Sequence, residues 1–104
     1  MFKVNNNDIY MTEHDFNVAL PITINGAEFD NTDSVKIVIK KNDEVVLEKI
    51  YNEIQDNTFN FILSETESEL LPLGHYFYHM DWYEDGAFRD CIVEKAKFIV
   101  TDKV

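Results

Sequence analysis

Residues 71–86, LPLGHYFYHMDWYEDG, hold the chain's densest group of side chains that could carry out chemistry. His75 and His79 are four residues apart, a spacing that lets two imidazoles share a metal ion on a helix. On a strand, with a rise of about 3.3 Å per residue, the same spacing separates them by roughly 13 Å. Because the surrounding residues alternate as in a strand, we expect both histidines to face solvent or a neighbouring strand, and we expect no metal site there.

Acidic side chains gather at the end of this stretch and just after it. Asp81, Glu84, Asp85 and Asp90 could converge on a cation if a hairpin placed positions 81 and 90 opposite each other, because hard cations bind several carboxylate oxygens. Their spacing matches no calcium loop, however, and a chain with 20 acidic residues brings some together by chance. The sequence leaves cation binding at these four acids open.

Other reaction chemistries have little support. Ser64 and Cys91 lack the local pattern of a nucleophile, and the glycines at 26, 74 and 86 are too few for a phosphate-binding loop. Cys91 is the only cysteine, which excludes an internal disulfide, and we expect it to be a buried, inert thiol. No catalytic residue and no cofactor is expected, so the sequence predicts a protein that is not an enzyme.

The charge balance limits the partners. The chain has 9 basic and 20 acidic residues, a net charge of -11, and the pair Lys40-Lys41 is its densest basic stretch. Nucleic acids and anionic membranes need clustered cations, so neither is an expected partner. No stretch is as long and apolar as a membrane span or a signal peptide, which predicts synthesis in the cytoplasm. The length of 104 residues predicts one domain, residues 1–104.

Alternation of apolar and polar residues is the main signal for the fold. Even positions from Phe16 to Ile24 are apolar, which predicts a half-buried strand, and Pro21 on its polar face predicts a sheet edge or a bulge. Further strands are expected at 9–12, 35–41, 44–51 and 58–63, with a hairpin turn at Asn42-Asp43. Ser64 with Glu67, or Thr66 with Glu69, has the form of a capping box, which predicts a short helical turn near 65–71.

The alternation within residues 71–86 predicts a strand with two different faces. Tyr76, Tyr78, Met80 and Trp82 share the face expected to line the core. After the turn at residues 83–87 the chain returns as one long strand or two short ones, and a parity shift predicts a bulge near Glu94-Lys95. About seven short strands and one helical turn predict an all-β, antiparallel sandwich of two sheets.

The opposite face of the same strand is the candidate binding surface. Phe77, His79 and Tyr83 lie on it, and exposed aromatic side chains are typical of protein interfaces. A covering loop or the N-terminal arm would explain them equally well. Trp82 would be the platform for a carbohydrate if it were exposed, but its parity places it inward.

The order of these elements resembles that of immunoglobulin-like sandwiches. A strand, a short crossing and then Leu-Gly-x-Tyr at residues 73–76 match the region where such domains place a tyrosine corner, which would be Tyr76. More narrowly, the chain is similar to the small immunoglobulin-like domains of phage and prophage tail or baseplate proteins, such as the N-terminal domain of baseplate upper proteins. The stretches that match are DFNVALPITING, SVKIVIKKNDEVVLEK, LPLGHYFYHMDWYEDG and EKAKFIVTDKV.

This resemblance implies a structural role and a place in a virion. The partners would be other protein subunits, including copies of the same chain, bound through outer-face aromatics or strand edges. A different interpretation is an acidic inhibitor that occupies the basic groove of a nucleic-acid-binding protein, because a net charge of -11 speeds encounter with cations. Such an inhibitor would lose association rate as salt rises, whereas an apolar assembly contact would hardly change.

Overall fold

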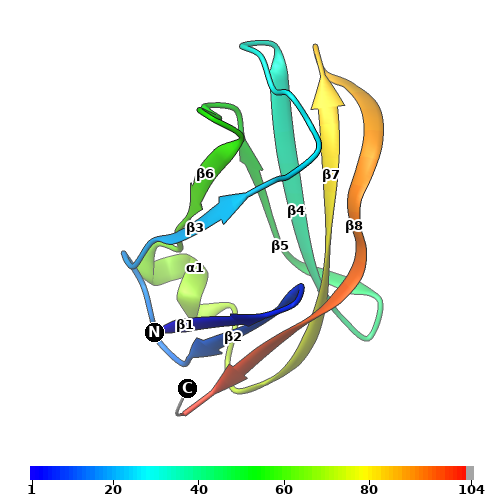
Figure 1. Cartoon of the computed structure of the whole chain (residues 1–104). Coiled ribbons are helices and arrows are strands. Elements are labelled where there is room, and N and C mark those ends of the chain that lie inside the picture. Colours follow the sequence, from blue (N-terminus) through cyan, green and yellow to red (C-terminus); the bar gives the residue numbers. More distant parts are fainter. Residues whose placement is uncertain (103–104) are drawn as a thin grey trace.

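The structure is a computed structural model that describes residues 1–102, in eight strands and one short helix. The elements in chain order are β1 (Phe2–Asn5), β2 (Asp8–Thr12), β3 (Leu20–Thr23), β4 (Asp33–Lys41), β5 (Glu44–Tyr51), β6 (Thr58–Phe61), α1 (Glu65–Glu69), β7 (Gly74–Glu84) and β8 (Ala87–Thr101). A six-stranded sheet has the order β1-β2-β8-β7-β4-β5, and β3 pairs with β6 in a second sheet. The small sheet and α1 lie together on one side of the large sheet (Figure 1). Lys103 and Val104, at the end of the last predicted strand, lie outside the described residues.

Two-residue turns join the strands of the two long hairpins. Asn42 and Asp43 have φ angles of 52° and 66°, and Asp85 and Gly86 have 48° and 81°. Positive φ at both positions gives the turn a twist that matches the paired strands, and Asn, Asp and Gly adopt it most easily. The hairpins predicted at these two turns, β4-β5 and β7-β8, are confirmed.

The N-terminal segment departs from the expected arrangement. It supplies two strands where the sequence predicts one, and β2 runs parallel to β8, with Ile9 opposite Phe98 and Met11 opposite Val100. The large sheet is therefore mixed, and the prediction of an antiparallel sandwich is wrong for this pair of strands. The parallel pair joins strands that are far apart in sequence, so no turn residues in the sequence predict their pairing.

The strand predicted over Phe16 to Ile24 is much shorter than expected. Only Leu20–Thr23 is extended and paired, whereas Phe16 and Val18 are 37% and 41% exposed. His14 and Asn17 have positive φ angles (66° and 59°), which breaks the alternation before the strand begins. Pro21 does lie in an edge strand, as its missing N–H requires.

The core lies between the two sheets, as the alternation in β7 predicts. Tyr76, Tyr78, Met80 and Trp82 are all buried, and Phe59 and Phe61 of β6 face them from the small sheet. The predicted burial of alternate residues along β7 is confirmed. The two sheets thus share one apolar interior, to which Val35, Ile37, Ile39, Leu63, Leu71, Phe98 and Val100 also contribute.

Bulges shape β8. Tyr78 pairs with Ala96 and Met80 with Val93, so Glu94 and Lys95 together face a single residue of β7. The predicted bulge is confirmed. Two further register shifts follow, between Met80 and Asp81 and between Trp82 and Tyr83, and the sequence analysis does not predict them.

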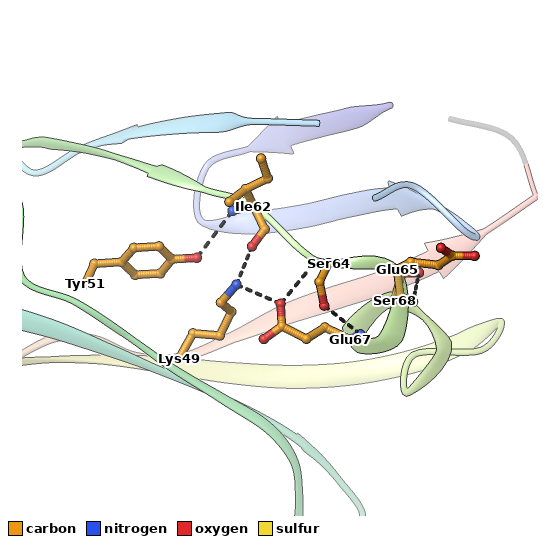
Figure 2. A network of polar contacts seen from close by, with 7 residues as sticks. All are labelled: Lys49, Tyr51, Ile62, Ser64, Glu65, Glu67 and Ser68. Atoms are coloured by element: carbon orange, nitrogen blue, oxygen red, sulfur yellow. Dashed lines mark hydrogen bonds and ion pairs between the residues drawn. The ribbon is translucent and has the colours of Figure 1, made fainter. Parts of the chain in front are cut away.

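The crossing from β6 to β7 contains α1, and a polar network ties it to β5. Ser64 and Glu67 form the predicted capping box: the Glu67 amide donates to Ser64 Oγ (3.1 Å), and the Ser64 amide donates to Glu67 Oε1 (2.9 Å). Lys49 Nζ donates to the same Glu67 oxygen (2.9 Å) and to the Ile62 carbonyl (Figure 2). Among residues 1–102 no helix is long and apolar enough to cross a membrane.

Candidate functional site

The outer face of the large sheet is the surface on which the predicted interface residues lie. We use this name for the side turned away from β3, β6 and α1, where Figure 1 shows no helix or strand among residues 1–102. Along β7, residues His75, Phe77, His79, Asp81 and Tyr83 point to this side and alternate with the buried row. The sheet thus presents a broad surface with no second layer on it.

Phe77, His79 and Tyr83 share this face but do not form one cluster. Phe77 and Tyr83 are six residues apart on one strand, about 20 Å at the usual rise. Between them His79 Nε2 lies 3.5 Å from Asp81 Oδ2, a pair that becomes ionic when the histidine is protonated. The outer face therefore has two aromatic ends and a polar middle.

Lysines surround the first aromatic end. Phe77, 41% exposed, stands opposite Lys40 on β4 and Lys97 on β8, and Lys95 Nζ lies 4.4 Å from the centre of its ring. The sequence shows no such cluster, because these lysines come from two strands far apart in the chain. The sheet register therefore creates a local basic and aromatic surface on an acidic protein.

The second aromatic end is the most exposed apolar part of the outer face. The rings of Tyr83 and Phe88 meet edge to face with centres 5.9 Å apart, and Phe88 is 60% exposed. Ile50 on the edge strand β5 is 61% exposed, and it lines a hollow of about 190 Å³ with Ser34, Lys36, Tyr83 and Gly86. Sequence reasoning missed Phe88 and Ile50, because only the pairing register places them beside Tyr83.

The four acidic residues at the β7-β8 turn do not converge. Asp81 stands opposite Cys91 while Asp90 stands opposite Trp82, and Glu84 forms an ion pair with Arg89. Asp90 Oδ1 accepts a hydrogen bond from the Cys91 amide (2.8 Å). Within residues 1–102 no group of three or more acidic, histidine or cysteine side chains is placed to hold a metal ion.

Cys91 is exposed, so the prediction of a buried thiol is wrong. The register shifts in β8 place it opposite Asp81, whose side chain lies on the outer face. Partial desolvation raises the pKa of the thiol, and the carboxylates of Asp81, Glu94 and Asp90 raise it further. A raised pKa disfavours the thiolate, which is the reactive form.

Trp82 is not a carbohydrate platform. It is 8% exposed, and its ring packs against Phe29 (centres 4.5 Å apart) and the Arg89 guanidinium (4.2 Å from the ring centre). Its inward position is the one predicted from its parity.

Tyr76 bonds back to the crossing that precedes its strand. Its hydroxyl donates to the Pro72 carbonyl at 2.7 Å, and its side chain is 2% exposed. Burial, with a contribution from the charge of Glu13, raises the pKa of the phenol, so it remains a donor at neutral pH. This bond fixes the end of the crossing to the start of β7.

Replacing Tyr76 with phenylalanine is expected to lower the free energy of unfolding by about 0.5–1.5 kcal/mol, since the Pro72 carbonyl loses its donor. Urea unfolding followed by Trp82 fluorescence measures the change. Tyr83→Phe, on the outer face, is the matched control and should change stability by no more than about 0.5 kcal/mol. Equal stability of Tyr76→Phe and the unmodified protein would show that the bond contributes nothing.

No protein-family model matches the chain, and no curated protein matches it significantly.

Proposed function

We propose that this domain is a non-enzymatic assembly module that binds other protein subunits, including copies of itself, through its outer face. The observation that carries the proposal is a sheet face that no other described part of the chain covers, on which Phe77, Phe88 and Ile50 are 41%, 60% and 61% exposed. Exposed aromatic and aliphatic side chains rimmed by polar groups are typical of protein interfaces. Lys36, Lys40 and Lys95 supply part of that polar rim.

The finer part of the proposal is an immunoglobulin-like domain of a phage or prophage tail or baseplate. It is supported by the resemblance of the sequence and by the bond of the Tyr76 hydroxyl back to the Pro72 carbonyl, which has the form expected of a tyrosine corner. The six-plus-two division of strands is unlike the more even division of immunoglobulin constant domains. The proposal therefore concerns the wider group of such sandwiches.

Light scattering across salt concentration tests the proposed assembly. Copies with a net charge of -11 repel each other, so raising sodium chloride from about 50 mM to about 500 mM screens the repulsion and leaves apolar burial intact. We expect the mass to exceed that of one chain and to stay constant or rise with salt. An acidic inhibitor would instead remain a monomer, and its binding to a basic partner would weaken with salt.

Two substitutions locate the contact. Phe88→Ser removes an exposed aromatic side chain from the outer face and is expected to return the protein to a single chain. Leu70→Ser is the matched control, because Leu70 is also exposed (48%) but follows α1 on the other layer. A monomer at every salt concentration, or equal effects of the two substitutions, would contradict assembly through the outer face.

A further inference from the structure

Among residues 1–102, no strand pairs with the outer edge of β3 in the small sheet. The Ile24 amide donates to the Asn57 carbonyl (2.8 Å), and Ile22 stands opposite Phe59, so the main-chain groups of these even positions point toward β6. In a strand the main-chain groups alternate in direction, so those of Pro21 and Thr23 point away from β6. The close contact of the Thr23 and Thr58 hydroxyls (2.8 Å) fits this register, because side chains approach most closely where the main chain is not bonded.

The free edge therefore offers hydrogen-bonding groups at the spacing of a strand. Proline has no N–H, so Pro21 presents its carbonyl alone, whereas Thr23 presents both its N–H and its carbonyl. In the described part of the chain β3 has no strand partner besides β6. These three groups are what an added strand would bind.

A groove runs beside this edge. It has a volume of about 380 Å³, within the range of about 300–1,000 Å³ that is usual for binding sites. One wall is β3 and the following Ile24-Asn25, and the other is the β1-β2 turn. The lining residues are Val4, Asn6, Asn7, Ile9, Leu20, Pro21, Ile22, Thr23, Ile24, Asn25, Tyr78, Met80, Ile92 and Val93. We call this hollow the β3 groove.

The lining of the β3 groove is uncharged and mixes apolar side chains with the polar ones of Asn6, Asn7, Thr23 and Asn25. None of its residues is charged, although charged residues make up 28% of the chain. Ile92 and Val93 remain half-buried at its base, and Val4 is 48% exposed at its rim. A two-stranded sheet cannot cover a six-stranded one, and the β3 groove is the part of the interior that it leaves open.

We propose that the β3 groove binds an extended polypeptide segment, which pairs with β3 as a third strand of the small sheet. The segment would turn alternate, uncharged apolar side chains onto Ile92 and Val93 and present neutral or basic side chains outward, because the protein carries a net charge of -11. Unpaired main-chain groups at strand spacing select a peptide over a lipid or a compact ligand. The inference depends on the proposed assembly role only for the source of the segment, a neighbouring subunit.

Amide exchange at Thr23 tests this directly. The probe is a short, capped peptide in which valine alternates with threonine and lysine, and its control carries N-methyl groups on the residues that would donate to β3. Without peptide, the Thr23 amide should exchange far faster than those of Ile22 and Ile24. With peptide, the Thr23 amide should become protected at least about tenfold, and the N-methylated peptide should give no protection.

A matched pair of variants tests the pairing of the peptide with β3 independently. Thr23→Pro removes the N–H on the free edge, whereas Thr23→Val keeps it; both lose the hydroxyl contact with Thr58. We expect peptide affinity to fall at least about tenfold in Thr23→Pro relative to Thr23→Val. If Thr23→Pro does not fold, the two peptides on the unmodified protein decide the question.

Unchanged Thr23 exchange with peptide present, or equal binding of the methylated and unmethylated peptides, would overturn the inference. Phe88→Ser should bind the peptide as the unmodified protein does, since Phe88 lies outside the β3 groove. Failure of outer-face assembly and failure of strand addition therefore give different results, the first in light scattering and the second in amide exchange.

Discussion

Replacing Phe61 with alanine is expected to lower the free energy of unfolding by about 3–5 kcal/mol, the usual cost of removing a buried phenylalanine ring. Phe61 is 1% exposed and lies in the small sheet. Its ring contacts three rings of the large sheet, those of Phe2, Tyr51 and Phe98, with centres 5.9, 6.4 and 6.1 Å away. One side chain thus joins β6 to strands β1, β5 and β8, so its loss opens a cavity between the layers.

Urea unfolding measured by Trp82 fluorescence and by far-ultraviolet circular dichroism gives the stability of this variant. Ile62→Ala is the control, because Ile62 is the next residue in the chain and is 37% exposed. We expect the control to cost much less than Phe61→Ala. A loss below about 1.5 kcal/mol for Phe61→Ala would mean that the two layers are not held together at this ring.

The parts of the fold that follow from local pattern could be predicted from the sequence. The buried row of β7 repeats every second residue, and the capping box of Ser64 and Glu67 needs only residues three apart. Asn42-Asp43 marks its hairpin by conformational preference alone. In each of these cases the residues that determine the local structure lie within a few positions of it in the sequence.

The parts set by pairing between distant segments could not be predicted. The parallel pair of β2 and β8 has no local signal, and the register shifts of β8 place Cys91 outward, against the expectation of a buried thiol. The positive φ of Asn17 likewise removed Phe16 and Val18 from the predicted row.

Part of the candidate site could likewise be predicted from local pattern, whereas the rest depends on pairing between distant strands. Alternation was enough to place Phe77, His79 and Tyr83 on one face, because they belong to one strand. The lysines around Phe77, the position of Phe88 beside Tyr83 and the β3 groove all depend on which strands are neighbours and in what register. These features therefore needed the three-dimensional structure.

Lys49→Met is expected to lower the free energy of unfolding by about 1–3 kcal/mol, because the Ile62 carbonyl loses its donor and the Glu67 carboxylate keeps the Ser64 amide but loses its cation. Lys49 Nζ lies 2.9 Å from Glu67 Oε1, donates also to the Ile62 carbonyl and is 5.7 Å from the centre of the Tyr51 ring (Figure 2). The side chains of Lys49 and Glu67 are 17% and 28% exposed, so water replaces the lost bonds only in part. Lys36→Met is the control, since Lys36 pairs with the more exposed Glu48 and should matter less.

A double-mutant cycle separates the ion pair from the rest of the network. Lys49→Met, Glu67→Gln and the double variant should show a coupling energy above about 0.5 kcal/mol at pH 7. Additive effects would mean that Lys49 acts mainly through the Ile62 carbonyl and the Tyr51 ring.

Acid should remove the coupling between Lys49 and Glu67. Burial acts to raise the pKa of Glu67, but the Ser64 amide and Lys49 together hold it below its ordinary value of 4.5. A carboxyl whose pKa is lowered by folding stabilises the folded state above its unfolded pKa and loses that contribution as the pH falls through the folded value. The difference in stability between the unmodified protein and Glu67→Gln should therefore be constant from pH 7 down to the ordinary pKa and shrink below it. A difference that stays constant down to the acid unfolding transition would show that the charge of Glu67 does not contribute to stability.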